Sequence, residues 1–88
     1  MKTIITFEIT EAAFNHGLAP DDILKFINFD WIQPLDPKNL LLDEEDIARI
    51  QLIVELKKDL GVNDEGVPII LHLIDQLNHL HDEINLNV

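Results

Sequence analysis

The alternation of apolar and polar positions predicts two short helices near the start of the chain, with a short strand on either side of them. Residues 4–7 are β-branched or aromatic, and residues 40–42 are three leucines, so these two segments are expected to form strands that pair. Thr10 is a suitable N-cap for a first helix over residues 11–16. A second helix is expected from Pro20 to about residue 30, since proline is favoured at the first helical position.

Two longer helices are predicted after the second strand. The acidic run 43–46 opens the third helix, whose apolar residues recur every three or four positions until Gly61 ends it. The fourth helix begins near Asn63 and carries an apolar seam at alternating steps of three and four, as in a coiled coil. We expect this seam to join two copies of the chain through Val67, Ile70, Ile74, Leu77, His81 and Ile84.

The first two helices have the spacing of a helix-turn-helix. Ala13 lets the helices approach, Gly17 allows the tight turn, and Ile23 packs the second helix on the first. The expected fold is therefore mainly α: a winged helix-turn-helix-like core with a minimal β-hairpin over residues 1–62, and a long C-terminal dimerisation helix over residues 63–88. The two parts are expected to form one compact domain overall.

Composition narrows the class of protein. With 88 residues and 47% apolar content, the chain fits one small globular domain. No apolar run approaches the roughly 20 residues of a membrane span, and the first residues lack the long apolar stretch of a signal peptide. The absence of cysteine excludes disulfides, thiol nucleophiles and cysteine-ligated metal sites. We therefore expect a cytoplasmic protein that does not interact with membranes.

Charge narrows the choice of partner. Six Lys and Arg residues stand against 17 Asp and Glu residues, for a formal net charge of −11. Nucleic-acid binders use Lys and Arg to neutralise phosphates, so nucleic acid is not an expected partner. A basic protein surface is the partner that this charge favours, mainly through the rate and specificity of encounter.

A series of short segments, in order along the chain, carries a family resemblance. The segments are FEITE at 7–11, HG at 16–17, IQP at 32–34, DLGVN at 59–63 and EGV at 65–67, followed by a leucine-rich helix. This set resembles the CbpM chaperone-modulator family, which is similar to a truncated MerR-type winged helix. The resemblance implies a homodimer formed through the C-terminal helix. It also implies a regulator that binds the J-domain of a DnaJ-like (CbpA-type) co-chaperone and inhibits its work with DnaK.

The acids of the helix-turn-helix are the expected partner-binding residues, because J-domains act on DnaK through a basic helix face. The residues expected to oppose cations on the partner are Glu11, Asp21, Asp22 and Asp30. Phe14 and Trp31 would be apolar anchors if they are exposed. Two competing interpretations remain. Asp21 and Asp22 also suit a helix start, and in so small a core Trp31 is expected to be buried.

Two other functions compete with this interpretation. A MerR-like transcription regulator would bind DNA through the second helix, but Lys25 is the single cation there beside three acids. A metal sensor could use the outer face of the fourth helix, where four residues share a spacing that suits zinc or nickel and equally suits a solvated face: His72, Asp75, His79 and Glu83. No catalytic arrangement is recognised, so we expect no enzyme activity, cofactor or bound metal.

Overall fold

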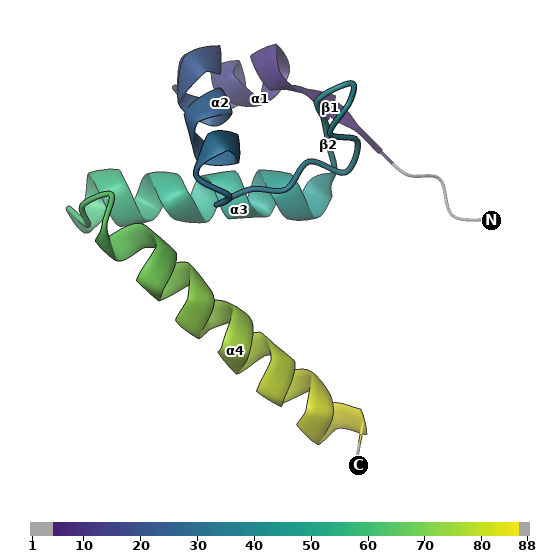
Figure 1. Ribbon diagram of the computed structural model, residues 1–88, viewed down its shortest axis with the longest axis vertical. Helices are drawn as coiled ribbons and strands as arrows, with labels where there is room; N and C mark the ends of the chain where they lie inside the picture. The colour runs from purple at the N-terminus through teal and green to yellow at the C-terminus, as the bar shows by residue number, and fades with distance from the viewer. Residues whose placement is uncertain (1–4, 87–88) are drawn as a thin grey trace.

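The computed structural model of the chain describes residues 5–86, with side chains as far as Glu83. Its elements, in order, are β1 (Phe7–Glu8), α1 (Ile9–Asn15), α2 (Pro20–Asn28), β2 (Leu41–Leu42), α3 (Glu44–Val54), a π-helical segment (Glu55–Asp59) and α4 (Gly66–Leu86). α1 and α2 lie on one side of α3, and α4 leaves the far end of α3 at an angle (Figure 1). This mainly helical architecture with a small sheet confirms the expected fold class.

The two strands form a minimal antiparallel sheet. Phe7 pairs with Leu42 and Glu8 pairs with Leu41. Of the strand predicted over residues 4–7, residues 5 and 6 precede β1 and residue 4 lies outside the described residues, and Leu40 lies outside β2. Leu40 has a φ of 55° and belongs to the loop before β2. The loop is held by Asp36, which accepts hydrogen bonds from the Asn39 side chain and backbone. These bonds hold the pKa of the Asp36 carboxyl below its ordinary value.

The start of α1 differs from the sequence prediction. Glu8 is the N-cap, so Thr10 lies inside the first turn, and Phe14 is 86% exposed. The reason is that β1 runs directly into the helix, which turns its alanine face toward the core and places Phe14 on the outside. The predicted turn is confirmed, because Gly17 has a φ of 67°, where a glycine carries no steric penalty.

α1 and α2 form the expected helix-turn-helix. Ala13, Ile23 and Phe26 are buried at their interface with the core. α2 ends before the predicted residue 30, because Phe29 is its C-cap and Asp30 takes a φ of 61°. The Trp31 backbone N–H then donates to the Phe26 carbonyl at 3.0 Å, which closes the helix end.

α3 supplies the centre of the core, and its first turn is fixed by two acids. Asp43 accepts a hydrogen bond from the Asp46 backbone N–H at 2.8 Å, and Asp46 accepts from the Asp43 N–H at 3.0 Å. This reciprocal arrangement is a capping box. The largest fully buried side chains come from α2, β2, α3 and α4: Ile23, Leu42, Ile50, Ile53, Val67 and Leu71.

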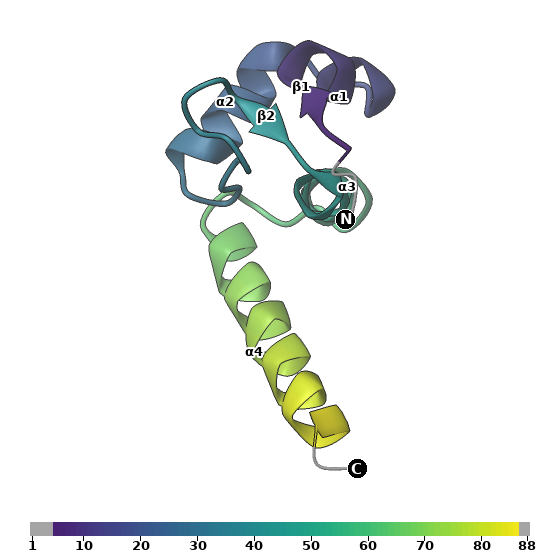
Figure 2. The same ribbon diagram turned by 90° about the vertical axis from the view of Figure 1, so that its right-hand side faces the viewer.

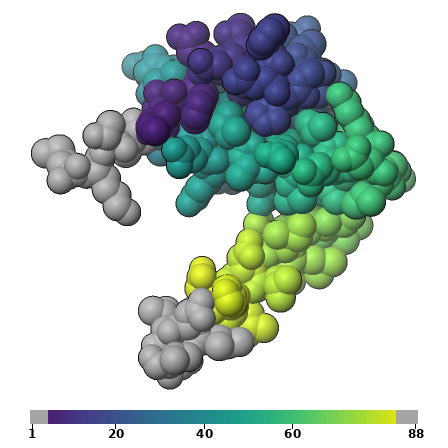
Figure 3. All heavy atoms as spheres, turned by 180° about the vertical axis from the view of Figure 1, so that it is seen from behind, coloured from purple at the N-terminus to yellow at the C-terminus, as the bar shows by residue number. Residues whose placement is uncertain are grey.

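α4 is joined to this core through its first half. Asn63 caps the helix start by accepting from the Gly66 backbone N–H at 2.7 Å. Val67 and Leu71 are buried and Ile74 is half-buried, whereas the last turns of the helix project away from the core (Figures 2 and 3). Within residues 5–86, no helix has both the length and the apolar character needed to cross a membrane.

Candidate protein-binding surface

Three of the four predicted acids are available on the helix-turn-helix surface. Glu11 on α1, Asp21 on α2 and Asp30 just after α2 are all exposed. Within the described part of the chain, none of these three carboxylates holds a hydrogen bond or an ion pair. The structure therefore leaves them free to oppose cations of a partner.

The fourth acid, Asp22, has a structural task. Its side chain is half-buried, and Oδ2 accepts a hydrogen bond from the Ala19 backbone N–H at 3.0 Å. This bond satisfies one of the backbone donors at the start of α2. Asp22 therefore fits the capping role considered for it, and its carboxylate is less available to a partner than that of Asp21.

The aromatic side chains divide between core and surface. Trp31 is only 5% exposed and stacks on Phe26 at 5.6 Å, so the expectation that it belongs to the core is confirmed. Trp31 was expected to act as an apolar anchor only if it were exposed, so it does not qualify as one. Phe14 is 86% exposed and is therefore available as an anchor. Sequence reasoning missed Phe29, which is 48% exposed and lies against the Trp31 ring at 5.0 Å.

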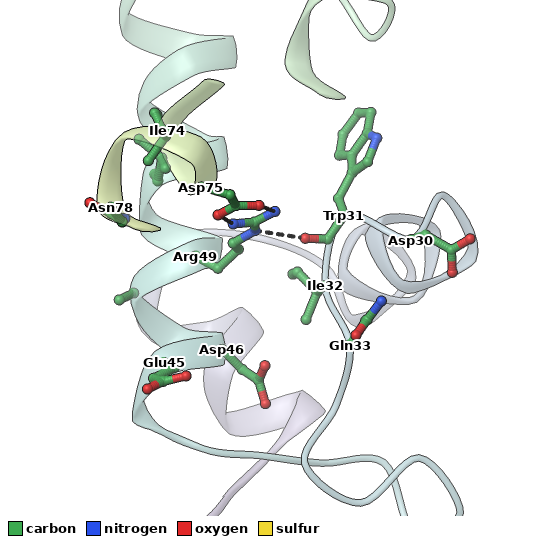
Figure 4. A pocket seen from close by; sticks show the side chains of 12 residues that line it. Asp30, Trp31, Ile32, Gln33, Glu45, Asp46, Arg49, Ile74, Asp75 and Asn78 are labelled. Carbon is green, nitrogen blue, oxygen red and sulfur yellow. Dashed lines mark hydrogen bonds and ion pairs between the residues drawn. The ribbon is translucent and has the colours of Figure 1, made fainter. Parts of the chain in front are cut away.

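A notch of about 640 Å³ lies where α3, α4 and the segment after α2 meet (Figure 4). Arg49 on α3 is its central cation. Nε of Arg49 donates to the Trp31 carbonyl at 2.9 Å, and its two terminal nitrogens donate to Asp75 on α4 at 2.6 and 3.0 Å. Arg49 thus connects three segments. The remaining acids of the notch are Asp30, Glu45 and Asp46.

The pKa values of two acids in the notch are shifted in opposite directions. The Arg49 hydrogen bond and charge, aided by His72, hold the pKa of the Asp75 carboxyl below its ordinary value of 3.8. Burial, together with the neighbouring Asp43 charge, raises the pKa of Asp46. Asp46 stays engaged because it also accepts from the Leu35 backbone N–H at 3.1 Å. Both acids thus serve the fold.

Asp75→Asn is expected to lower the free energy of unfolding by up to about 1 kcal/mol at pH 7, the range of solvent-accessible ion pairs. Because the pKa of Asp75 is depressed in the folded protein, its contribution is complete above the unfolded value near 4 and is lost as pH falls through the folded pKa. Urea unfolding should show that the difference in the free energy of unfolding between the parent and Asp75→Asn is smaller at pH 2.5 than at pH 7. Asp82→Asn, an exposed α4 control, should show little effect, and an equal Asp75→Asn effect at both pH values would contradict the assignment.

The predicted dimer seam of α4 is only partly exposed. Val67 is fully buried in its own core, Ile70 and Ile74 are half-buried, and Leu77 and His81 are exposed. The side chain of Ile84 lies outside the described side chains. A second apolar row is more exposed than this seam. We call this row the α4 stripe, and it consists of Ile69, Leu73, Leu77 and Leu80.

The histidine face of α4 has ordinary surface contacts. His79 faces Glu83 at 3.1 Å, one helical turn away, and Asp75 is bound to Arg49. Among the described residues, no group of three or more potential ligands could hold a metal ion.

Comparison with known proteins agrees with this architecture. The model of the MerR HTH family of regulatory proteins matches residues 7–86, from β1 to the end of α4. The chain belongs to the MerR HTH family. Its buried Ala13 and Ile23 and its Gly17 turn are the features from which a helix-turn-helix was predicted.

This MerR-family chain is also similar to proteins named chaperone modulatory protein CbpM. Two such relatives come from Escherichia coli strain K12 / DH10B and from Shigella boydii serotype 18. Each is 24% identical over 84 residues, and the alignment covers 93% of this chain and 83% of the relative. The resemblance to the CbpM chaperone-modulator family is thereby confirmed.

Proposed function

We propose that this protein is a non-enzymatic modulator of a chaperone system, which binds the J-domain of a DnaJ-like (CbpA-type) co-chaperone and inhibits it. The observation that carries the proposal is the free acidic surface of the helix-turn-helix. Glu11, Asp21 and Asp30 are exposed and have no partner among the described residues, and Phe14 projects from the same motif. The names of the CbpM relatives support the chaperone part of the proposal.

The chemistry of this surface suits a basic protein helix. Several exposed acids raise the rate of encounter with a cationic partner, although each exposed ion pair adds little affinity. An apolar anchor supplies affinity when it becomes buried. Phe14 has most of its side chain available for that purpose. A J-domain held through its basic face would be unable to present that face to DnaK.

We further propose that the protein acts as a homodimer joined through α4. The α4 stripe exposes four large aliphatic side chains at helical spacing. At about 100° per residue, they fall within roughly a quarter of the helix circumference, which is the width of a coiled-coil seam. Pairing of two copies would remove this stripe from water. It would use Leu77 from the predicted seam and would leave Val67 in the core.

DNA binding is the second candidate, and the MerR family match is the observation that favours it. The charge of −11 opposes it. A gel shift at low salt with generic duplex DNA discriminates the two functions, since phosphate-driven binding would fall steeply as salt is added. Robust DNA binding would favour the transcription regulator.

Inhibition of a J-domain is tested with purified components. The protein should bind an isolated DnaJ-like J-domain in calorimetry, and it should reduce the stimulation of DnaK ATPase by that J-domain while leaving basal ATPase unchanged. Phe14→Ala tests the proposed apolar anchor. The variant should keep its fold, because an 86% exposed ring contributes little to stability. Unaltered stimulation at saturating protein would contradict the proposed function.

A further inference from the structure

A second hollow lies at the turn of the helix-turn-helix. It has a volume of about 290 Å³ and shares no lining residue with the notch. Its apolar wall is made by Leu18, Phe26 and Val54, of which Phe26 is buried and the other two are half-buried. Apolar side chains that line a concave surface are typical of a small-ligand site. We call this hollow the lysine cleft, because its remaining wall includes Lys25, Lys57 and Lys58.

The lysine cleft gathers half of the cations of the chain, which has six Lys and Arg residues in all. Lys57 pairs with Asp64 and lies over the Trp31 ring. Lys25 and Lys58 have no carboxylate partner within residues 5–86, and Lys58 Nζ has only the Gly17 carbonyl at 3.5 Å. In a protein with 17 acids, these two lysines therefore line a cavity without an ion-pair partner among the residues that the structure describes.

Among the described residues that line the cleft, Asp22 is the one acid, and one of its carboxylate oxygens is held by the backbone. Its Oδ2 accepts from the Ala19 backbone N–H at the start of α2. Gly17 also lines the cleft, and a Cβ at this position would meet no atom within 4 Å apart from its chain neighbours, so the surface is open at this point of the turn. Lys57 and Lys58 belong to the π-helical segment Glu55–Asp59, and such segments frequently occur at functional sites.

We propose that the lysine cleft binds a small amphipathic carboxylate. The apolar tail packs on Leu18, Phe26 and Val54, and the carboxylate lies between the ammonium groups of Lys25 and Lys58. The volume lies at the lower limit of ordinary ligand pockets, so it suits a ligand of roughly ten non-hydrogen atoms or fewer. None of the residues that carry the proposed function lines this cleft, so the proposal does not depend on that function.

Sodium hexanoate is the probe, and amide NMR with the full chain is the measurement, at ionic strength held constant with sodium chloride. We expect saturable shifts at Gly17, Leu18 and Lys58. Trp31 fluorescence should change as well, because its ring stacks on Phe26 and lies near Lys57. Hexanol, which has the tail without the charge, should bind at least about fivefold more weakly, and inorganic phosphate should cause no saturable shift, since both parts of the cleft are needed.

Paired variants show whether the lysines carry the binding. Lys25→Gln with Lys58→Gln should raise the dissociation constant for hexanoate at least about fivefold, since two charge-assisted contacts are lost. Both lysines are exposed, so the fold should persist. The control is Lys38→Gln, which replaces an exposed lysine in the loop before β2. This variant should leave the dissociation constant for hexanoate unchanged.

Three outcomes would overturn the proposal. Hexanoate shifts confined to the α4 stripe would identify non-specific apolar binding, and equal affinity in the double variant would remove the lysines from the site. A third overturning outcome is that a pentapeptide ending in Leu with a free carboxylate binds, while hexanoate does not. That result would assign the cleft to a protein C-terminus instead of a small molecule.

Discussion

Reversal of charge at Glu11, Asp21 and Asp30, all to lysine, is expected to weaken binding of a J-domain by about ten- to a hundredfold at low salt. Each exposed ion pair contributes up to about 1 kcal/mol, and reversal replaces attraction with repulsion at three positions. Binding by the parent should weaken as salt is added, and the salt dependence should flatten in the variant. Calorimetry at 50 and 300 mM sodium chloride measures both effects.

The choice of acids follows from the structure. Asp22 is left unchanged because it accepts the Ala19 N–H at the start of α2, so its reversal would mix loss of the helix cap with loss of binding. A control triple variant makes the same change in charge elsewhere. It reverses Asp59, Glu65 and Asp82, which are exposed outside the helix-turn-helix. Equal weakening by both triple variants would show that net charge, not this surface, governs binding.

Leu77→Asp is expected to convert the proposed homodimer to monomers, with the dimer dissociation constant raised by about a hundredfold or more. Leu77 is 65% exposed in the single chain and belongs to both the predicted seam and the α4 stripe. A carboxylate buried there without a partner would cost several kcal/mol. Sedimentation equilibrium over a range of concentrations measures the change, and circular dichroism should show that the helix content is retained.

The matched control for the dimer is His79→Asp. It places the same carboxylate on α4, on a side chain that is 78% exposed and faces Glu83 instead of the stripe. Its self-association should stay close to that of the parent. If Leu77→Asp and the control sediment alike, or if the parent is monomeric at high concentration, the α4 stripe is not a dimer interface.

The sequence was sufficient for features that depend on local chemistry. The helix-turn-helix could be predicted because Ala13, Gly17 and Ile23 have steric roles that hold at fixed spacing. The start of α3 could be predicted because acids in a first turn satisfy backbone donors. Charge could be counted directly, and it already favoured a basic partner over nucleic acid.

Several errors came from interactions between distant segments. Thr10 is a good N-cap by propensity, but pairing of β1 with β2 carries the strand directly into α1 and makes Glu8 the cap. The notch could not be foreseen either, because Arg49 and Asp75 are 26 positions apart and meet only when α4 leaves α3 at this angle. The spacing of apolar residues predicts which face of a helix is apolar, but it does not predict which other segment packs on that face.

Taken alone, the sequence determined the helical class, the turn of the motif and the acidic character of the protein, because these follow from residue type and short-range spacing. Only the tertiary structure decided which of those residues remain available. It buried Trp31 and Val67, exposed Phe14 and brought Lys25 and Lys58 to the same cleft. The physical reason is that burial and pairing depend on how separate helices pack, which no local pattern specifies.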